Sequence, residues 1–480
     1  MHCRVNRVSL TMMWNSGVLA VLIAVTVLTA WSSPAWAIPA FARKYDLPCS
    51  VCHVPGFPKL NDFGNIFRDH GYQLGNEQEL PTFAGLTKGY WPVSFRTTVG
   101  YQLANMKNAG DDGAGNNVNV ATGSFGFTGL DVLSFGILAR DISYAIVYTP
   151  GLASAGFYAA PTNNDSDLES AWVKLDNLFH SDYLLNVKVG KYELDLPVSE
   201  KRLPTLNTSI VMYHYIAGTP YLAGLTDNVF AFGNPNSFAI GENQPGLEVF
   251  GIKNTPGGGY FRYSLNALSN SNITGPNTGG GRGVNFYGHV TQSFGGYGVV
   301  TGQRVGVFGT YGNAPTVDNP GCPVSGTCGP ISGAGQPFYR VGLDASLTAL
   351  NQFNLILAGM RAMDSKNLFT SLAVPNAQDA VWYGGLAELD YNPSQLPAWL
   401  FIYRYDVIRN DGQGNGTPGF PKAYNDVNSH TLMARYYFHI SDRTDTTLHL
   451  EYNYAQDRGV GTDGGDRIAH TVLIALDFAL

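Results

Sequence analysis

The sequence has 480 residues, of which 44% are hydrophobic and only 14% are charged, and its net charge is −7. Ordinary soluble proteins contain roughly 25% charged residues, so the composition is unusual for a soluble protein. The negative net charge argues against nucleic acid as a partner.

The first 37 residues have the pattern of a secretory signal peptide. A start containing two arginines is followed by an apolar run over residues 17–30 and an A-x-A cleavage site at Ala35–Ala37. A single transmembrane anchor is the alternative, but the run is short for one and no stop-transfer pattern follows. We therefore expect residues 1–37 to be a signal peptide, with no transmembrane helix after it.

Residues 47–56, LPCSVCHVPG, contain two cysteines two residues apart, followed by a histidine. Covalent haem attachment needs this order, because both thiols add to the haem and the adjacent histidine reaches the iron. Two other sites use closely spaced cysteines. A zinc site requires four ligands, and a dithiol redox site requires a βαβ context. The sequence has no second C-x-x-C motif and no βαβ pattern around this one. The motif predicts one haem c on Cys49 and Cys52, with His53 as the proximal iron ligand.

The segment from residue 38 to about 90 lacks strand alternation and is too small to build a good core unaided. An attached haem would supply its apolar centre, so we expect a small α-helical cytochrome c domain over residues 38–90. Leu60, Phe63, Phe67 and His70 recur at helical spacing and share one face.

His70 is the candidate distal ligand of the haem iron, because it ends this stripe. The alternative is a water-facing histidine that the helix dipole favours. The further candidates for the distal position are Met212, His214, Met433, His439 and His449.

From residue 91 to the C-terminus, the sequence alternates with a period of two, as strands do. Near the end, Val472, Ile474, Leu476 and Phe478 share one face. An apolar face opposite a face with isolated charges is typical of a transmembrane barrel with a polar interior. A soluble β-sandwich is the alternative, since its strands alternate too.

The connections between these segments decide in favour of the barrel. The short ones are ARD, NLFHSD, TPGG, ALNQ, NPSQLP and SDRTD, and the long ones include NAGDDGAGNNVNVATG, SNSNITGPNTGGG and DGQGNGTPGFPKAYND. Outer-membrane barrels have short periplasmic turns and long extracellular loops. We expect an all-β, antiparallel, porin-like outer-membrane barrel of about 16 strands over residues 91–480, with the cytochrome domain plugging its lumen.

The sequence also predicts the structure of two loop segments. About fifty residues separate the strand YLLNVKVGKYEL from the strand near Gly246, which is too long for an idle loop. Its stretch SIVMYHYIAG is apolar, so we expect part of it to fold into the barrel mouth as a constriction. Cys322 and Cys328 lie in a Gly/Pro-rich loop and predict a local disulfide in an oxidising compartment.

The segment PAFARKYDLPCSVCHVPGFPKLNDFGNIFRDHGYQL resembles the N-terminal signature of the fused outer-membrane monohaem cytochrome–porins, an iron-oxidising family. The matching positions are Phe41-Ala42-Arg43, the haem motif, Pro58, Leu60, Phe63-Gly64, Phe67 and Gly71-Tyr72, with a weaker echo in VKVGKYELDLPVSEKR. The resemblance implies an outer-membrane cytochrome that oxidises extracellular Fe(II) and passes the electron through its haem to a periplasmic cytochrome, in an iron:cytochrome c oxidoreductase-type reaction.

Two other functions fit the sequence. A transport porin with a structural haem plug predicts solute permeability and no haem reduction by Fe(II), whereas electron export to an external acceptor keeps the architecture and reverses the current. Sparse charge would also suit an acid habitat. Acidic residues that could attract iron, but are more often simply solvated, are Asp111, Asp112, Asp165, Asp167 and Glu169.

Overall fold

The chain divides into two compact units, residues 1–38 and 39–480. The computed structural model describes residues 40–45, 47–53, 58–74, 81, 92–112, 116–150, 167–206, 209–222, 236, 238–256, 259–269, 284–294, 303–316, 331–350, 352–368, 378–411, 425–441, 444–461 and 464–479. The predicted signal peptide, Asp165 and the predicted Cys322–Cys328 disulfide lie outside these residues, as do the side chains of Asp111 and Asp167.

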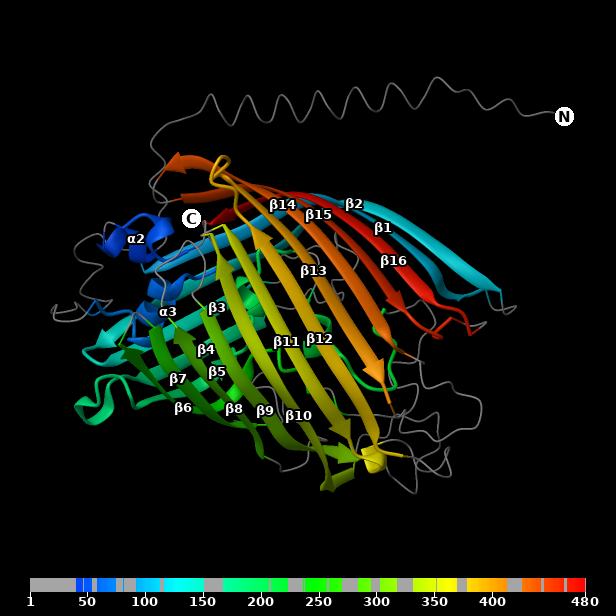
Figure 1. Ribbon diagram of the computed structural model, residues 1–480, viewed down its shortest axis with the longest axis horizontal. Coiled ribbons are helices and arrows are strands. Elements are labelled where there is room, and N and C mark those ends of the chain that lie inside the picture. The colour runs from blue at the N-terminus through cyan, green and yellow to red at the C-terminus, as the bar shows by residue number, and fades with distance from the viewer. Residues whose placement is uncertain are drawn as a thin grey trace. The chain divides into compact units, whose positions relative to one another are not determined.

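Sixteen antiparallel strands close into a single barrel, in which each strand pairs with its neighbours in sequence and β1 pairs with β16 (Figure 1). They are β1 (Val93–Asp111), β2 (Asn117–Ala139), β3 (Ile142–Thr149), β4 (Asp167–Leu175), β5 (Asn186–Tyr192), β6 (Gln244–Thr255), β7 (Gly259–Ser269), β8 (Val284–Phe294), β9 (Gln303–Thr316), β10 (Ile331–Ala349), β11 (Phe353–Asp364), β12 (Ala380–Tyr391), β13 (Trp399–Asn410), β14 (Val427–Ser441), β15 (Thr444–Asp457) and β16 (Arg467–Ala479). The predicted barrel and its strand number are confirmed.

The helices are short. They are α2 (Ala40–Tyr45), η1 (Cys49–Val51), α3 (Asp62–Asp69), η2 (Leu178–His180), η3 (Glu200–Arg202), α5 (Val211–His214) and η4 (Lys366–Leu368). In the part of the chain that the structure describes, no helix has the length and apolar character needed to cross a membrane.

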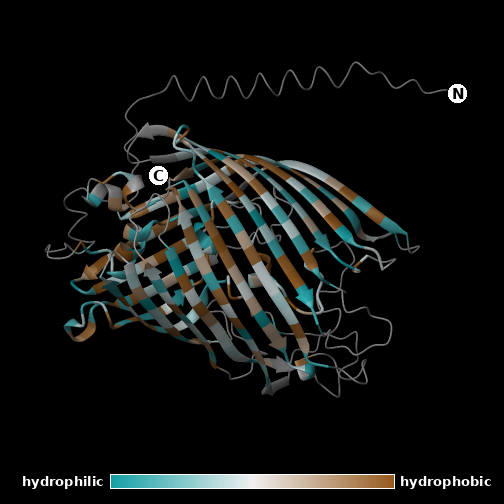
Figure 2. Ribbon diagram, viewed as in Figure 1, coloured by the Kyte–Doolittle hydropathy of each residue, from teal (hydrophilic) through white to brown (hydrophobic). Residues whose placement is uncertain are grey.

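Hydrophilic and hydrophobic residues alternate along the strands (Figure 2), and exposed residues alternate with buried ones. In β16, for example, Leu473 is buried while Ile474 is 51% exposed. Charged side chains such as Glu388, Arg404 and Asp406 are buried inside, and apolar ones are exposed outside. A soluble β-sandwich would bury its apolar face, so this inverted arrangement is that of a membrane barrel with a polar interior.

The short connections lie where the sequence predicted them, including the two-residue turn Arg140–Asp141 between β2 and β3. One long loop was predicted wrongly, because most of NAGDDGAGNNVNVATG belongs to β1 and β2. These strands remain paired from Asn105↔Ala121 to Gly110↔Val118. Gly, Asn and Ala dominate this extension, and its apolar residues, such as Met106 and Val120, are too few to give the alternation by which strands are recognised in sequence.

The described part of the connection between β5 and β6 packs against the lumen wall; the sequence predicted that part of this connection would fold into the barrel mouth. We call its described residues, 193–206, 209–222, 236 and 238–243, the strap. Its backbone N–H groups bond to carboxylates of the lumen wall, from Val211 to Asp406 at 3.3 Å and from Tyr221 to Asp457 at 2.6 Å. The strap and the wall bury a common apolar core, in which the rings of Tyr215 and Trp382 are 4.8 Å apart.

Candidate functional site

A single helical turn brings the three residues of the haem motif together. Cys49 starts the turn η1, Cys52 ends it, and the N–H groups of Cys52 and His53 both donate to the Cys49 carbonyl, at 3.1 and 2.9 Å. The two cysteines are not joined in a disulfide. Both cysteines and His53 line the same cavity, whose volume is about 710 Å³.

Helix α3 packs directly against this turn. Its N-cap Asn61 accepts a hydrogen bond from the Gly64 N–H at 2.9 Å and donates its own N–H to the Cys52 carbonyl at 2.9 Å. A Cβ at position 64 would overlap the Cys52 carbonyl oxygen. Glycine is therefore required for the helix to approach the motif.

An aromatic cluster forms the apolar wall of the cavity. Phe67 lies at its centre, with ring centroids 5.2 Å from Phe41, 5.6 Å from Tyr45 and 5.8 Å from Tyr72. Phe63 stacks on Phe67 at 6.3 Å. Such clusters exclude water and present flat apolar surfaces to a ligand.

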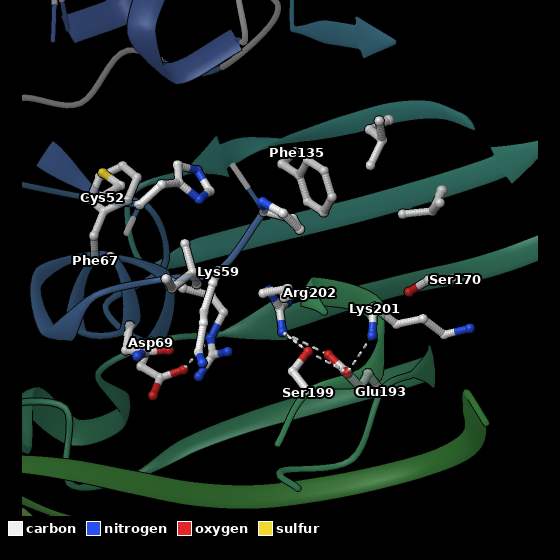
Figure 3. Close-up of a pocket in the computed structure, with 18 of the residues that line it drawn as sticks. Cys52, Lys59, Phe67, Asp69, Phe135, Ser170, Glu193, Ser199, Lys201 and Arg202 are labelled. Carbon is white, nitrogen blue, oxygen red and sulfur yellow. Dashed lines mark hydrogen bonds and ion pairs between the residues drawn. The ribbon is translucent and has the colours of Figure 1, made fainter. Parts of the chain in front are cut away.

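The barrel supplies the opposite wall. The Tyr72 ring is 6.1 Å from Phe135 of β2 and 6.4 Å from Trp172 of β4, and all three residues line the cavity. Figure 3 shows Cys52, Phe67 and Phe135 around this space, with Arg202 and Lys201 of the strap beyond them. The cavity is thus enclosed jointly by the N-terminal segment, the lumen wall and the strap.

Ion pairs and hydrogen bonds hold the N-terminal segment to the lumen wall. Lys59 pairs with Asp390 and lies 3.6 Å from Glu388, both in β12. On α3, Asp69 accepts from Arg262 of β7 at 2.7 Å. The start of α2 is fixed as well, because the Ala40 N–H donates to the Ser94 hydroxyl at 2.9 Å.

Burial changes the protonation of the motif residues. It raises the pKa of the Cys52 thiol to about 11 and lowers the pKa of His53 to about 4. At neutral pH the thiol is therefore protonated and the imidazole is neutral. Within the described residues, no group of three or more His, Cys, Asp or Glu side chains is arranged to hold a metal ion.

The structure places the candidate distal ligand His70 at the C-cap of α3. Its ring stacks on Tyr183, with centroids 4.0 Å apart and planes 7° from parallel, and it is not among the residues that line the cavity. Axial ligation by His70 stays a prediction.

The further candidates for the distal position have partners elsewhere in the lumen. Met212 is in the strap core, Met433 packs with Leu400 and Ile402, and His449 bonds to Glu451 at 2.9 Å. His214 bonds to Glu200 at 2.5 Å, and the His439 side chain lies outside the described residues. None of these four described side chains is among the residues that line the cavity.

Sequence reasoning missed the wall of the cavity that the barrel contributes. Phe135, Trp172 and Arg262 sit on strands β2, β4 and β7 and meet the motif only because the barrel closes. For Trp172 and Arg262, the available signal was their inward position beside the apolar outward residues Val173 and Phe261. Among the acidic residues considered for iron, Glu169 lines this cavity and pairs with Lys201 of the strap at 2.9 Å.

These features define the class of the protein. A closed sixteen-stranded barrel with an apolar exterior, a charged lumen and connections that are short at one end and long at the other is an outer-membrane β-barrel of porin-like architecture. The end with short turns, where β1 begins and β16 ends, is the periplasmic end by this rule.

Comparison with protein-family models and with curated proteins gives no match. Among solved structures, the chain is similar to OprB of Pseudomonas putida, at 14% identity over 81% of this chain and 94% of that one, with a TM-score of 0.45. The anion-selective porin from Comamonas acidovorans gives 10% identity, 81% and 99% coverage and a TM-score of 0.45. The channel DcaP of Acinetobacter baumannii gives 13%, 81% and 97%, and 0.43.

Proposed function

We propose that the chain is an outer-membrane monohaem cytochrome–porin that oxidises extracellular Fe(II) and delivers the electron to a periplasmic cytochrome. The observation that carries this proposal is the position of Cys49, Cys52 and His53 on one cavity that the N-terminal segment, the lumen wall and the strap enclose together. A covalent haem c held there supplies one-electron exchange at a fixed position inside the barrel.

The residues present fit such a group. Two thiols outside any disulfide and an adjacent imidazole are the donor set of covalent haem attachment. The cavity of about 710 Å³ is within the roughly 300–1,000 Å³ of sites that enclose compact organic ligands. Its aromatic wall suits a flat macrocycle, and the basic side chains that line it would balance carboxylate groups of the ligand.

Each part of the site has a distinct role. Cys49 and Cys52 would tether the group, and the neutral His53 ring would ligate its iron. Phe67 and its aromatic neighbours exclude water, which raises the reduction potential of a buried metal centre. Lys59 and Asp69 fix the segment to the wall, so that the distance from the motif to either end of the barrel stays constant.

The strap favours electron transfer over solute transport. Its core residues Ile210, Val211 and Tyr213 are buried against lumen-facing side chains such as Phe308 and Trp382. Lumen carboxylates, which line the water path in a diffusion channel, here accept hydrogen bonds from the strap backbone. The lumen is thus packed where a transport porin needs an open passage.

The proposal is tested first by the haem content of the purified full-length protein, produced in a host that attaches haem c. We expect one covalent haem per chain in the pyridine haemochrome spectrum. The double variant Cys49→Ala/Cys52→Ala should lose it, whereas the matched variant Cys322→Ala/Cys328→Ala should keep it. A wild-type barrel that folds without covalent haem would overturn the proposal.

A further inference from the structure

The outer surface of the barrel carries two aromatic rims of different chemistry. At the periplasmic end, the rim consists of aromatic side chains in contact with one another. Phe353 stacks on Tyr391 at 4.6 Å, and Trp399 lies 5.7 Å from Phe401 and 5.1 Å from Tyr436. Aromatic rings of this kind mark the depth of the membrane–water interface.

The rim at the opposite end mixes aromatic and basic side chains. Strand register sets Arg361 beside Tyr383, Tyr383 beside Arg409, and Tyr454 beside both His430 and His470. We call this row the outer belt: Arg361, Tyr383, Arg409, His430, Tyr454 and His470. Its members lie within a few residues of the outer ends of β11 to β16, so the belt follows one level across six of the sixteen strands.

The side chains of the outer belt are held in place; Arg361, Tyr383 and His470 are exposed, and the other three are partly exposed. The Arg361 guanidinium lies over the Tyr339 ring at 5.4 Å, and Arg409 donates to the Asn428 amide oxygen at 2.6 Å. His430 and His470 are each 2.9 Å, through Nδ1, from a tyrosine hydroxyl, those of Tyr403 and Tyr452. When the hydroxyl donates, the ring proton sits on Nε2, which is then a donor.

The acidic side chains of these strands face the lumen, whereas some basic side chains lie on the outer face. The carboxylates of Asp364, Glu388, Asp406, Glu451 and Asp477 are buried in the lumen. Arg361 and His470 instead lie exposed on the outside. The outer belt therefore presents cationic and N–H donor groups at the membrane surface, of which Arg409 lies close enough to Asp426 to interact with its charge.

We propose that the outer belt binds the phosphate groups of a phosphorylated glycolipid in the outer leaflet of the membrane. Arginine forks match phosphate oxygens in bidentate geometry, and basic side chains at the interface attract anionic headgroups. The tyrosine rings position the belt at headgroup depth, with the apolar band below them to contact acyl chains. The site is separate from the haem motif and does not depend on it.

The test uses the purified full-length protein in detergent, with native mass spectrometry to count bound lipid. The probes are a bis-phosphorylated lipid A, its dephosphorylated counterpart and inorganic phosphate. The variant is Arg361→Gln/Arg409→Gln. Its matched control is Lys253→Gln, since Lys253 is an exposed outer residue near the periplasmic end of β6, and heat-modifiable migration on a gel confirms that each variant is folded.

We expect the wild type and Lys253→Gln to retain bis-phosphorylated lipid A, and the double variant to bind it roughly 25-fold more weakly, from about fivefold per basic side chain. The dephosphorylated lipid should bind all three proteins equally weakly. Equal binding of both lipids to the wild type, or an unchanged affinity in the double variant, would overturn the proposal. Inorganic phosphate that competes as effectively as the lipid would reduce the belt to a general anion site and would also overturn it.

Discussion

Arg262 of strand β7 donates its Nε–H to Asp69, the last residue of helix α3, at 2.7 Å, and both side chains are buried. Arg262 also pairs with Asp195 of the strap. One guanidinium thus links the three parts that enclose the cavity: the barrel wall, the N-terminal segment and the strap.

Replacing Arg262 by methionine should loosen the N-terminal segment. Removing one partner of a buried ion pair costs about 3–5 kcal/mol when the remaining charge is left uncompensated. Asp69 keeps its pair with Arg68 at 3.0 Å, so we expect a loss below that range. We expect the segment around α3 to become sensitive to limited proteolysis while the barrel stays intact. The control is Arg140→Met, because the Arg140 side chain is 89% exposed in a turn; equal protease resistance in both variants would contradict this role.

The same linkage has a defined pH dependence. Burial opposes ionisation of Asp69, but the charges of Arg262 and Arg68 prevail and hold its pKa well below the usual range. A depressed pKa in the folded state contributes stability above the unfolded value of about 3.9, and this is lost as the pH falls through the folded value. Protease resistance of the wild-type segment should therefore be constant from pH 7 to about 5 and decline only in stronger acid.

The Glu200–His214 pair should make the strap more secure at mildly acid pH. Burial opposes the charge of His214, but its hydrogen bond to Glu200 and that carboxylate's charge raise its pKa. A raised pKa contributes stability that is complete below the unfolded value of about 6.5 and is lost as the pH rises through the folded value. We therefore expect hydrogen exchange of the strap amides to become faster above neutral pH, after correction for the intrinsic pH dependence of amide exchange.

In His214→Gln this pH dependence should disappear, whereas His180→Gln, at an exposed turn position, should behave as the wild type. Amide exchange in the strap that rises equally with pH in all three proteins would refute the role of His214.

Replacing residues 209–217 by a Gly-Ser linker should open the lumen. These residues contribute Ile210, Val211 and Tyr215 to the buried core that the strap shares with the wall. In planar bilayers we expect low single-channel conductance from the wild type and porin-like conductance from the linker variant. Leu343→Ile, at a 68% exposed outer position, is the matched control, and high conductance from the wild type would favour the transport-porin alternative.

His70→Ala tests the predicted distal ligand. If His70 ligates the iron, its removal should abolish the low-spin absorption spectrum and shift the midpoint potential. An unchanged spectrum and potential would show instead that the His70 ring serves to pack on Tyr183. Tyr183→Phe is the control, because it keeps the stacked ring and removes only the hydroxyl.

The barrel was predictable because its strands face lipid on one side and a polar lumen on the other, which imposes period-two alternation on residues such as Leu473 and Ile474. The β1–β2 extension escaped the prediction because Gly, Asn and Ala dominate it and its apolar residues, such as Met106 and Val120, are few. The haem motif was readable because Cys49, Cys52 and His53 are close in sequence. The contacts of Lys59 with Asp390 and of Tyr72 with Trp172 were not, since they span long separations fixed only by barrel closure.

The most direct measurement is stopped-flow absorbance of the oxidised, haem-loaded protein mixed with Fe(II) at acid and at neutral pH. We expect rapid appearance of reduced haem bands, followed by reoxidation when a periplasmic cytochrome is added. A haem that stays oxidised with Fe(II), yet is reduced by dithionite, would contradict iron oxidation and point to electron export or a structural haem.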